Sequence, residues 1–168
     1  IDLTGEAKFT VADPTVAKVD ETGRVFPLAN GTTEITAEYG GQTAEVPGTG
    51  AGMEAPQPIS FPNEIVPVLT KLGCSSGGCH GKIQGQNGFR LSLLGFDPEL
   101  DYTTLVKEAR GRRVFPAAPD HSLLLLKASG AVAHGGGKRM EAGSDEYKLI
   151  RRWIAAGTPF GSSDDPVV

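Results

Sequence analysis

In residues 73–81 the chain reads Gly73-Cys74-Ser75-Ser76-Gly77-Gly78-Cys79-His80-Gly81, which contains both of its cysteines. On an ideal helix, a spacing of three residues returns a second side chain to nearly the same face, after about 300°. The spacing of five found here turns it by about 500°, well off that face. We therefore expect the segment between the cysteines to bulge. Its residues suit a bulge, because glycine enters left-handed conformations at little steric cost and serine hydroxyls satisfy local backbone groups.

The order of the two thiols and the imidazole is that of a c-type haem attachment site lengthened by two residues, C-x-x-x-x-C-H in place of C-x-x-C-H. In such a site the cysteines form thioethers with the porphyrin and the adjoining histidine binds the iron. Two other interpretations stay open. In an oxidising compartment Cys74 and Cys79 could form a disulfide, with His80 incidental. A closed zinc site needs four ligands, and His121 and His134 lie far along the chain.

Helical periodicity lies on both sides of this motif. Apolar residues three and four apart predict a short amphipathic helix ending at the motif, and further helices near residues 98–109, 119–128 and 144–157. Asp120 is a candidate cap for the third of these helices, and Ser144 for the last. A helix before the motif and another closing the chain is the layout of a small cytochrome c, in which these helices cross beside the haem.

Residues 1–46 alternate between apolar and polar side chains, which predicts half-buried strands separated by short turns. The segments 13–20, 23–25 and 30–37 resemble the second half of a bacterial immunoglobulin-like domain of group 2. The opening strands of that family are absent, so we expect a truncated domain with a structural role. Residues 47–58 are rich in glycine and proline and are predicted to be a linker.

The composition bears on two classes of function, nucleic-acid binding and insertion into a membrane. The net charge is −4, whereas a nucleic-acid binder would present a basic face. There is no run of 18 apolar residues, so no membrane span is expected. The chain begins at Ile1 without a signal peptide, and we interpret it as a piece of a longer protein.

A second resemblance covers residues 61–160, which are similar to the cytochrome c-like domain of large planctomycete proteins, where immunoglobulin-like modules often flank it. The matching segments are Val66-Pro67-Val68-Leu69, residues 73–81, Asn87-Gly88-Phe89-Arg90-Leu91-Ser92-Leu93, Gly111-Arg112-Arg113, Ser122-Leu123-Leu124-Leu125-Leu126-Lys127, His134-Gly135-Gly136-Gly137-Lys138-Arg139 and residues 147–157. The resemblance implies one covalent haem c. The expected fold class is two small domains: an all-β immunoglobulin-like fragment at 1–46, and a mainly α cytochrome c fold at 59–161 followed by a tail at 162–168.

In such a domain His80 is the proximal iron ligand, and we expect its Nδ1–H to donate to a backbone carbonyl. The distal ligand has three candidates. The resemblance singles out His134, whereas Met140 lies where ordinary small cytochromes place their methionine, just before the last helix. His121 is the third candidate, and a water or an open site also remains possible. The basic residues expected beside the haem propionates are Arg90, Arg112, Arg113, Lys138 and Arg139.

The expected function is single-electron transfer, with a redox partner protein, in a module that is not itself a complete enzyme. Two strong axial ligands close the iron and leave electron transfer as its chemistry. An open sixth site would instead indicate a haem peroxidase or a gas or redox sensor, and a disulfide would indicate a haem-free, stapled binding module. Because thioether formation needs reduced thiols and exported haem, we expect a periplasmic or otherwise extracytoplasmic location.

Overall fold

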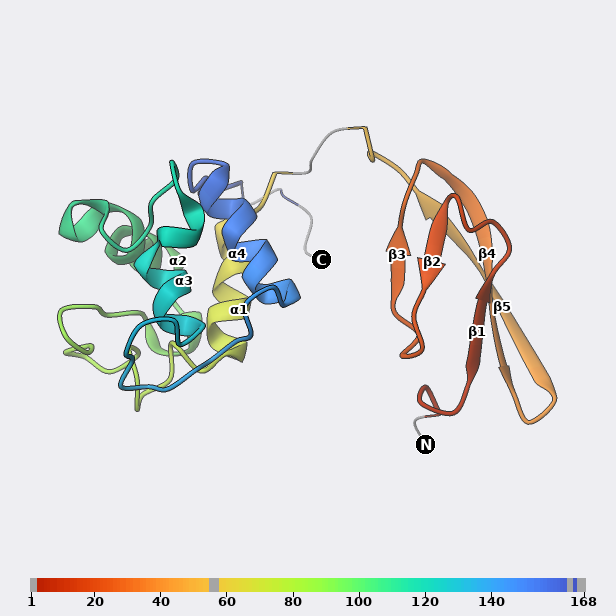
Figure 1. The fold of residues 1–168 in the computed structure, drawn as a ribbon, viewed down its shortest axis with the longest axis horizontal. Coiled ribbons are helices and arrows are strands. Elements are labelled where there is room, and N and C mark those ends of the chain that lie inside the picture. The colour runs from red at the N-terminus through yellow and green to blue at the C-terminus, as the bar shows by residue number, and fades with distance from the viewer. Residues whose placement is uncertain (1–2, 55–57, 163–164, 166–168) are drawn as a thin grey trace. The chain divides into compact units, whose positions relative to one another are not determined.

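The computed structural model describes residues 3–54, 58–162 and 165. The chain divides into two compact units, Ile1–Gln57 and Pro58–Val168 (Figure 1). The main hydrophobic cluster of buried residues lies entirely within the second unit, between Ile59 and Ile154.

The first unit contains two antiparallel sheets. The larger one has the strand order β1-β4-β5, and the smaller one pairs β2 with β3. The strands are β1 (Lys8–Val11), β2 (Ala17–Val19), β3 (Val25–Pro27), β4 (Gly31–Tyr39) and β5 (Gln42–Gly50). Gly40 and Gly41 join β4 to β5, and both have positive φ angles, 58° and 78°, as the tight two-residue turn between right-twisted strands requires.

Strand β5 extends further than the sequence pattern indicates. Residues 47–50, predicted to belong to a linker, pair with the start of β4, where Gly50 lies opposite Gly31. Their glycines permit this close pairing, because a Cβ added at Gly50 would lie 2.5 Å from the carbonyl oxygen of Ala29. Backbone pairing therefore outweighs the low strand propensity of this segment.

The second unit is built from short helical segments joined by loops. The α-helices are α1 (Val66–Lys71), α2 (Pro98–Tyr102), α3 (Leu123–Ala128) and α4 (Asp145–Ala155), and single 3₁₀ or π turns occupy Phe61–Ile65, Leu93–Gly95, Thr103–Lys107, Glu108–Gly111 and Pro119–His121. Ser144 caps α4 as predicted, since its hydroxyl accepts the backbone N–H of Tyr147. Asp120 does not cap α3; its carboxylate accepts hydrogen bonds from Tyr147 and Arg151 of α4 instead.

Aromatic side chains fill the centre of this unit. Phe61 and Trp153 are fully buried, and their ring centres lie 5.3 Å apart. The indole N–H of Trp153 donates to the carbonyl oxygen of Pro159 at 2.8 Å, which satisfies the one polar atom of the ring. These contacts connect the start of the unit to α4 and to the segment after it.

The predicted fold class, an all-β immunoglobulin-like domain followed by a mainly α cytochrome c fold, is wrong. The structure is mixed, with 30% helix and 19% strand, and its helices are few and short. Three of the four α-helices have five or six residues, and α4 has eleven. Proline stands at the start of α1 and α2, and glycines with positive φ end many segments, so the helical periodicity of the sequence is divided into single turns.

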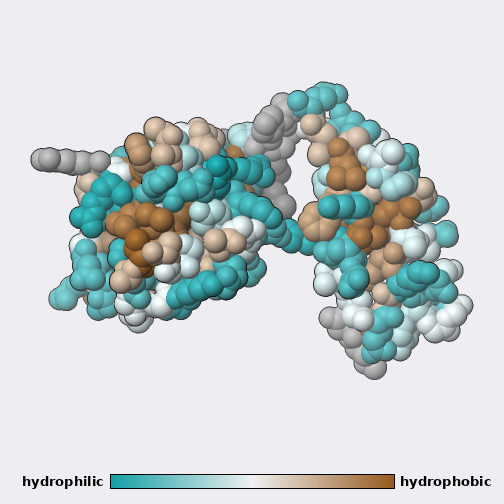
Figure 2. Space-filling view, in the orientation of Figure 1, coloured by the Kyte–Doolittle hydropathy of each residue, from teal (hydrophilic) through white to brown (hydrophobic). Residues whose placement is uncertain are grey.

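Apolar side chains also reach the surface of the second unit, where Figure 2 shows brown atoms among the hydrophilic ones. Its large apolar residues with more than half of their surface exposed are Ile83, Leu93, Leu94, Phe96 and Phe115. Within the described part of the chain, no helix has the length and apolar character needed to cross a membrane.

Candidate functional site

The cysteine motif forms a chain of hydrogen-bonded turns directly after α1. The N–H of Cys74 donates to Leu69 at the end of that helix, and the N–H of His80 donates back to the carbonyl of Cys74 at 3.0 Å. A Cβ added at Gly81 would lie 1.9 Å from the carbonyl oxygen of Ser75, so only glycine fits there. Left-handed glycine is expected between the cysteines, but neither Gly77 nor Gly78 has a positive φ; the left-handed glycine is Gly73, with φ 74°, just before Cys74.

Both thiols are free and partly buried. Burial raises the pKa of the Cys74 thiol, and the nearby charge of Arg139 partly opposes that rise. The guanidinium of Arg139 donates to the sulfur of Cys79 at 3.6 Å. The guanidinium of Arg139 therefore lies close enough to act on both thiols.

His80 is held by its Nδ1 atom. This nitrogen lies 3.1 Å from the carbonyl oxygen of Phe89, and because a carbonyl only accepts, Nδ1 carries the proton. The Phe89 ring packs against the imidazole, with ring centres 4.5 Å apart. Burial lowers the pKa of His80, the hydrogen bond to Phe89 acting in the opposite direction. The neutral ring therefore has a lone pair on Nε2, which is the form that binds metals.

His134 has the same arrangement in a second loop. Its Nδ1 lies 2.9 Å from the carbonyl oxygen of Gly137, which again assigns the lone pair to Nε2. A Cβ added at Gly136 would lie 3.1 Å from Cε1 and 3.4 Å from Nε2 of His134. The absence of a side chain at residue 136 thus leaves room for the ring.

The two imidazoles are brought together in a nearly parallel orientation. Their centres are 6.3 Å apart and their planes differ by 6°. An imidazole nitrogen binds a first-row metal at about 2.0–2.1 Å and lies about 1.1 Å from its ring centre, so two rings across one ion have centres roughly 6.3 Å apart. The observed separation equals that distance, but the two rings are stacked, whereas two imidazoles that share one ion meet it edge-on, so binding would require the rings to turn.

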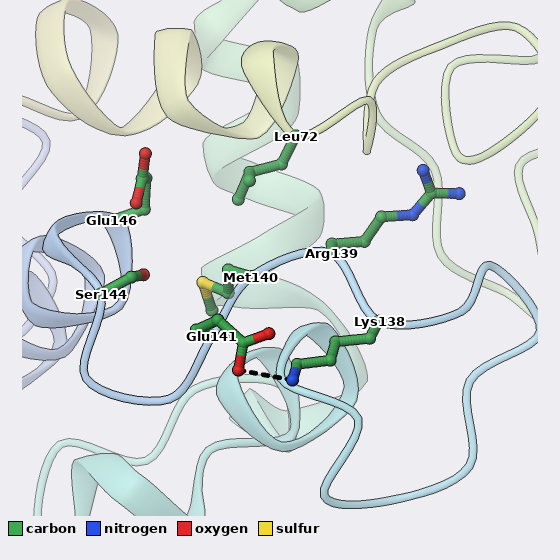
Figure 3. A pocket seen from close by; sticks show the side chains of 7 residues that line it. All are labelled: Leu72, Lys138, Arg139, Met140, Glu141, Ser144 and Glu146. Carbon is green, nitrogen blue, oxygen red and sulfur yellow. Dashed lines mark hydrogen bonds and ion pairs between the residues drawn. The ribbon is translucent and has the colours of Figure 1, made fainter.

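The other two candidates for the distal ligand have different surroundings. Met140 has 6% of its surface exposed and packs in the apolar core. It also borders a shallow hollow of about 410 Å³, toward which Leu72 extends from the end of α1 (Figure 3). His121 is exposed at the end of the Pro119–His121 turn. The structure thus brings His134, and not His121, into ring contact with His80.

The predicted propionate residues have different surroundings. Arg113 is held by the carbonyls of Thr104 and Gly88 and lies over the Phe89 ring. Arg90 and Arg112 are exposed, and Lys138 forms an ion pair with Glu141. In Figure 3 the guanidinium of Arg139 points away from that pair. Arg139 alone of these residues contacts a cysteine.

Comparison of the chain with family models, curated proteins and solved structures found no match. Among the described residues, no group of three or more histidine, cysteine, aspartate or glutamate side chains could hold a metal ion. A haem iron takes four nitrogens from its porphyrin and needs only two axial ligands from a protein. Two free thiols on one loop and two imidazoles with free Nε2 lone pairs fit that requirement better than they fit a closed zinc site.

Two residues that hold or make room for the two imidazoles are not singled out by the sequence. Phe89 supplies the backbone carbonyl for His80, and Gly136 leaves space for His134. Any residue can supply a carbonyl, so the role of Phe89 has no sequence signature. The sequence contains three glycines in a row after His134, but which of the three lies against the ring depends on the loop conformation.

Proposed function

We propose that residues 58–168 form an electron-transfer module that carries one covalent haem c. In this proposal Cys74 and Cys79 supply the thioether sulfurs, and His80 and His134 supply the axial nitrogens. The observation that carries it is the nearly parallel pair of imidazoles 6.3 Å apart, located beside two free thiols. When bound, the haem iron would accept and release one electron.

The residues of this chain would hold and orient the two ligands. The carbonyls of Phe89 and Gly137 fix the two rings through their Nδ1 atoms. Such hydrogen bonds raise the basicity of the ligating nitrogen and set the orientation of the ring. His80 and His134 would both hold the iron, and two such protein ligands would favour electron transfer over peroxidase or sensor chemistry.

The exposed apolar side chains beside the cysteine loop support the same proposal. A Cβ added at Gly77 would lie 3.7 Å from Leu93, and Leu93 and Leu94 are 54% and 63% exposed. A macrocycle attached to this loop would cover apolar surface that otherwise faces water. Thioether formation would require export of the unfolded chain with reduced thiols. We therefore place the module outside the cytoplasmic membrane, where it would exchange electrons with a partner protein.

Absorption spectra of the ferric and ferrous protein, produced with the c-type maturation machinery, test this assignment. We expect a low-spin spectrum without the far-red charge-transfer band of methionine-bound iron. His134→Ala should become high-spin and bind carbon monoxide, whereas Met140→Leu should resemble the wild type, because leucine refills the apolar volume. The reverse pattern would transfer the distal role to Met140. An already high-spin wild type, unchanged in both variants, would contradict the electron-carrier assignment.

A further inference from the structure

Asp101 is a buried carboxylate outside the ligand set. Asp101 is 1% exposed. It belongs to α2, which comes after the cysteine loop in the sequence. One oxygen accepts the backbone N–H of Ser92, and the other accepts the Ser92 hydroxyl at 2.9 Å. The Ser92 hydroxyl in turn accepts the backbone N–H of Asp97. This carboxylate therefore fixes Ser92 at two points, its backbone N–H and its side-chain hydroxyl.

The segment held by Asp101, residues 89–94, contacts the cysteine loop three times. The carbonyl of Phe89 accepts Nδ1–H of His80. The N–H of Leu91 donates to the carbonyl of His80 at 2.8 Å, and the N–H of Leu94 donates to the carbonyl of Ser75 at 3.0 Å. Ser92 thus directly follows the two contacts that hold the ring and the backbone of His80, and precedes the one that holds Ser75.

The conformation of this segment requires such an anchor. Leu94 has φ 55° and ψ 26°, a left-handed conformation that costs free energy in any residue with a Cβ. Its side chain is 63% exposed, so little burial offsets that cost. The surrounding contacts hold the segment in this conformation, and the hydrogen bonds between Asp101 and Ser92 are buried.

We propose that Asp101 is a positioning residue for His80. By holding Ser92, it places the Phe89 carbonyl where it fixes the Nδ1–H form of the His80 ring and directs the Nε2 lone pair to the ligand position. This inference assigns a role to a residue outside the proposed ligands. It rests on the proposed function only for the identity of what Nε2 binds.

The test is the tautomer of His80, measured by ¹⁵N NMR on the full chain without haem at a pH where the imidazole is neutral. A neutral imidazole free in water prefers the Nε2–H form, so a fixed Nδ1–H form reports the Phe89 contact. We expect Nδ1–H in the wild type and loss of that preference in Asp101→Ala. Asp101→Asn should restore it, because the amide oxygen still accepts from Ser92 N–H and the amide nitrogen can donate to the hydroxyl.

Two controls separate positioning from general destabilisation. His134 is bonded to Gly137 and should keep its tautomer in every variant. Tyr102→Phe, in the same helix, removes the hydrogen bond from Tyr102 to the Thr158 carbonyl and should leave His80 unchanged. If Asp101→Ala does not fold, Ser92→Ala removes one of the two contacts and should weaken the Nδ1–H preference in a folded chain. An unchanged His80 tautomer in the folded Ala variants would overturn the inference.

The loaded protein gives an independent readout. Weakening the hydrogen bond to Phe89 makes the His80 ring a poorer donor to ferric iron, so Asp101→Ala should shift the reduction potential to more positive values and Asp101→Asn should not. If the wild type takes up no haem, the proposed function fails while the NMR result still decides the role of Asp101. A normal tautomer response with an unshifted potential would overturn the claim that the ring orientation matters to the ligand position.

Discussion

Two neighbouring glycines in the His134 loop have different surroundings. A Cβ added at Gly136 would lie 3.1 Å from the His134 ring and 3.3 Å from the Arg139 guanidinium, whereas one added at Gly135 meets nothing within 4 Å. Neither glycine has a positive φ, so alanine is compatible with the backbone at both positions. The two substitutions therefore differ only in the space available around the added methyl group.

We expect Gly136→Ala to displace the His134 ring and Gly135→Ala to leave it in place. In haem-loaded protein, Gly136→Ala should give a mixture of high-spin and low-spin iron and faster binding of carbon monoxide, and Gly135→Ala should match the wild type. Absorption spectra and carbon monoxide kinetics measure the effect. Equal behaviour of the two variants would show that His134 is not confined by this loop.

Single residues also show what the sequence could and could not establish about the site. The Cys74, Cys79 and His80 motif follows from residue type and spacing, whereas His134 is singled out by the resemblance to a family. The contact that orients His80 does not, because Phe89 acts through its backbone and reaches the ring only through the fold of the intervening turn. The propionate residues are predicted from their charge, which does not show that Arg113 donates to the carbonyls of Thr104 and Gly88.

Among the secondary-structure elements, one ion pair connects the end of α1 to the beginning of α4. Lys71 lies 2.8 Å from Glu146, whose side chain is 23% exposed. The hydrogen bond from Lys71 and the backbone N–H at the start of the helix lower the pKa of Glu146 from 4.5 to about 2. Because the pKa is lower in the folded state, the ionised form stabilises folding above pH 4.5, and this contribution is lost as the pH falls through about 2.

We expect Glu146→Gln to lower the free energy of unfolding at pH 7 by about 0.5–1 kcal/mol, as for a partly exposed pair at a helix N-terminus. The difference from the wild type should shrink as the pH falls below about 4, which urea unfolding at several pH values can follow. In a Lys71→Gln background the substitution should cost less. A pH-independent difference would mean that the effect arises from packing and not from the charge.

The lengths of the helices also explain why the predicted fold class is wrong. Local signals located several elements: Ser144 begins α4, and strands lie in the predicted alternating segments. Periodicity could not show that residues 98–111 break into an α-helix followed by a π turn and a 3₁₀ turn. The layout of one helix before the motif and one at the end suggested a known fold by analogy, and analogy of element order does not determine element length or packing.

At the scale of the whole molecule, the proposed chemistry belongs to the second unit. Its thiols, both paired imidazoles and the Asp101–Ser92 anchor all lie between residues 74 and 134. The main buried cluster lies in the same unit. In the first unit only Val16, Ala17 and Thr33 are buried among the described residues, and no proposed ligand lies there.

The central claim is the covalent attachment of one haem through Cys74 and Cys79, and the intact mass of the purified chain tests it most directly. After production with the c-type maturation machinery, the mass should exceed that of the polypeptide by one haem and should survive denaturation. The double variant Cys74→Ser, Cys79→Ser should show the bare polypeptide mass. A wild-type mass lower than the polypeptide by two hydrogens would demonstrate a disulfide and no haem, and it would contradict the account.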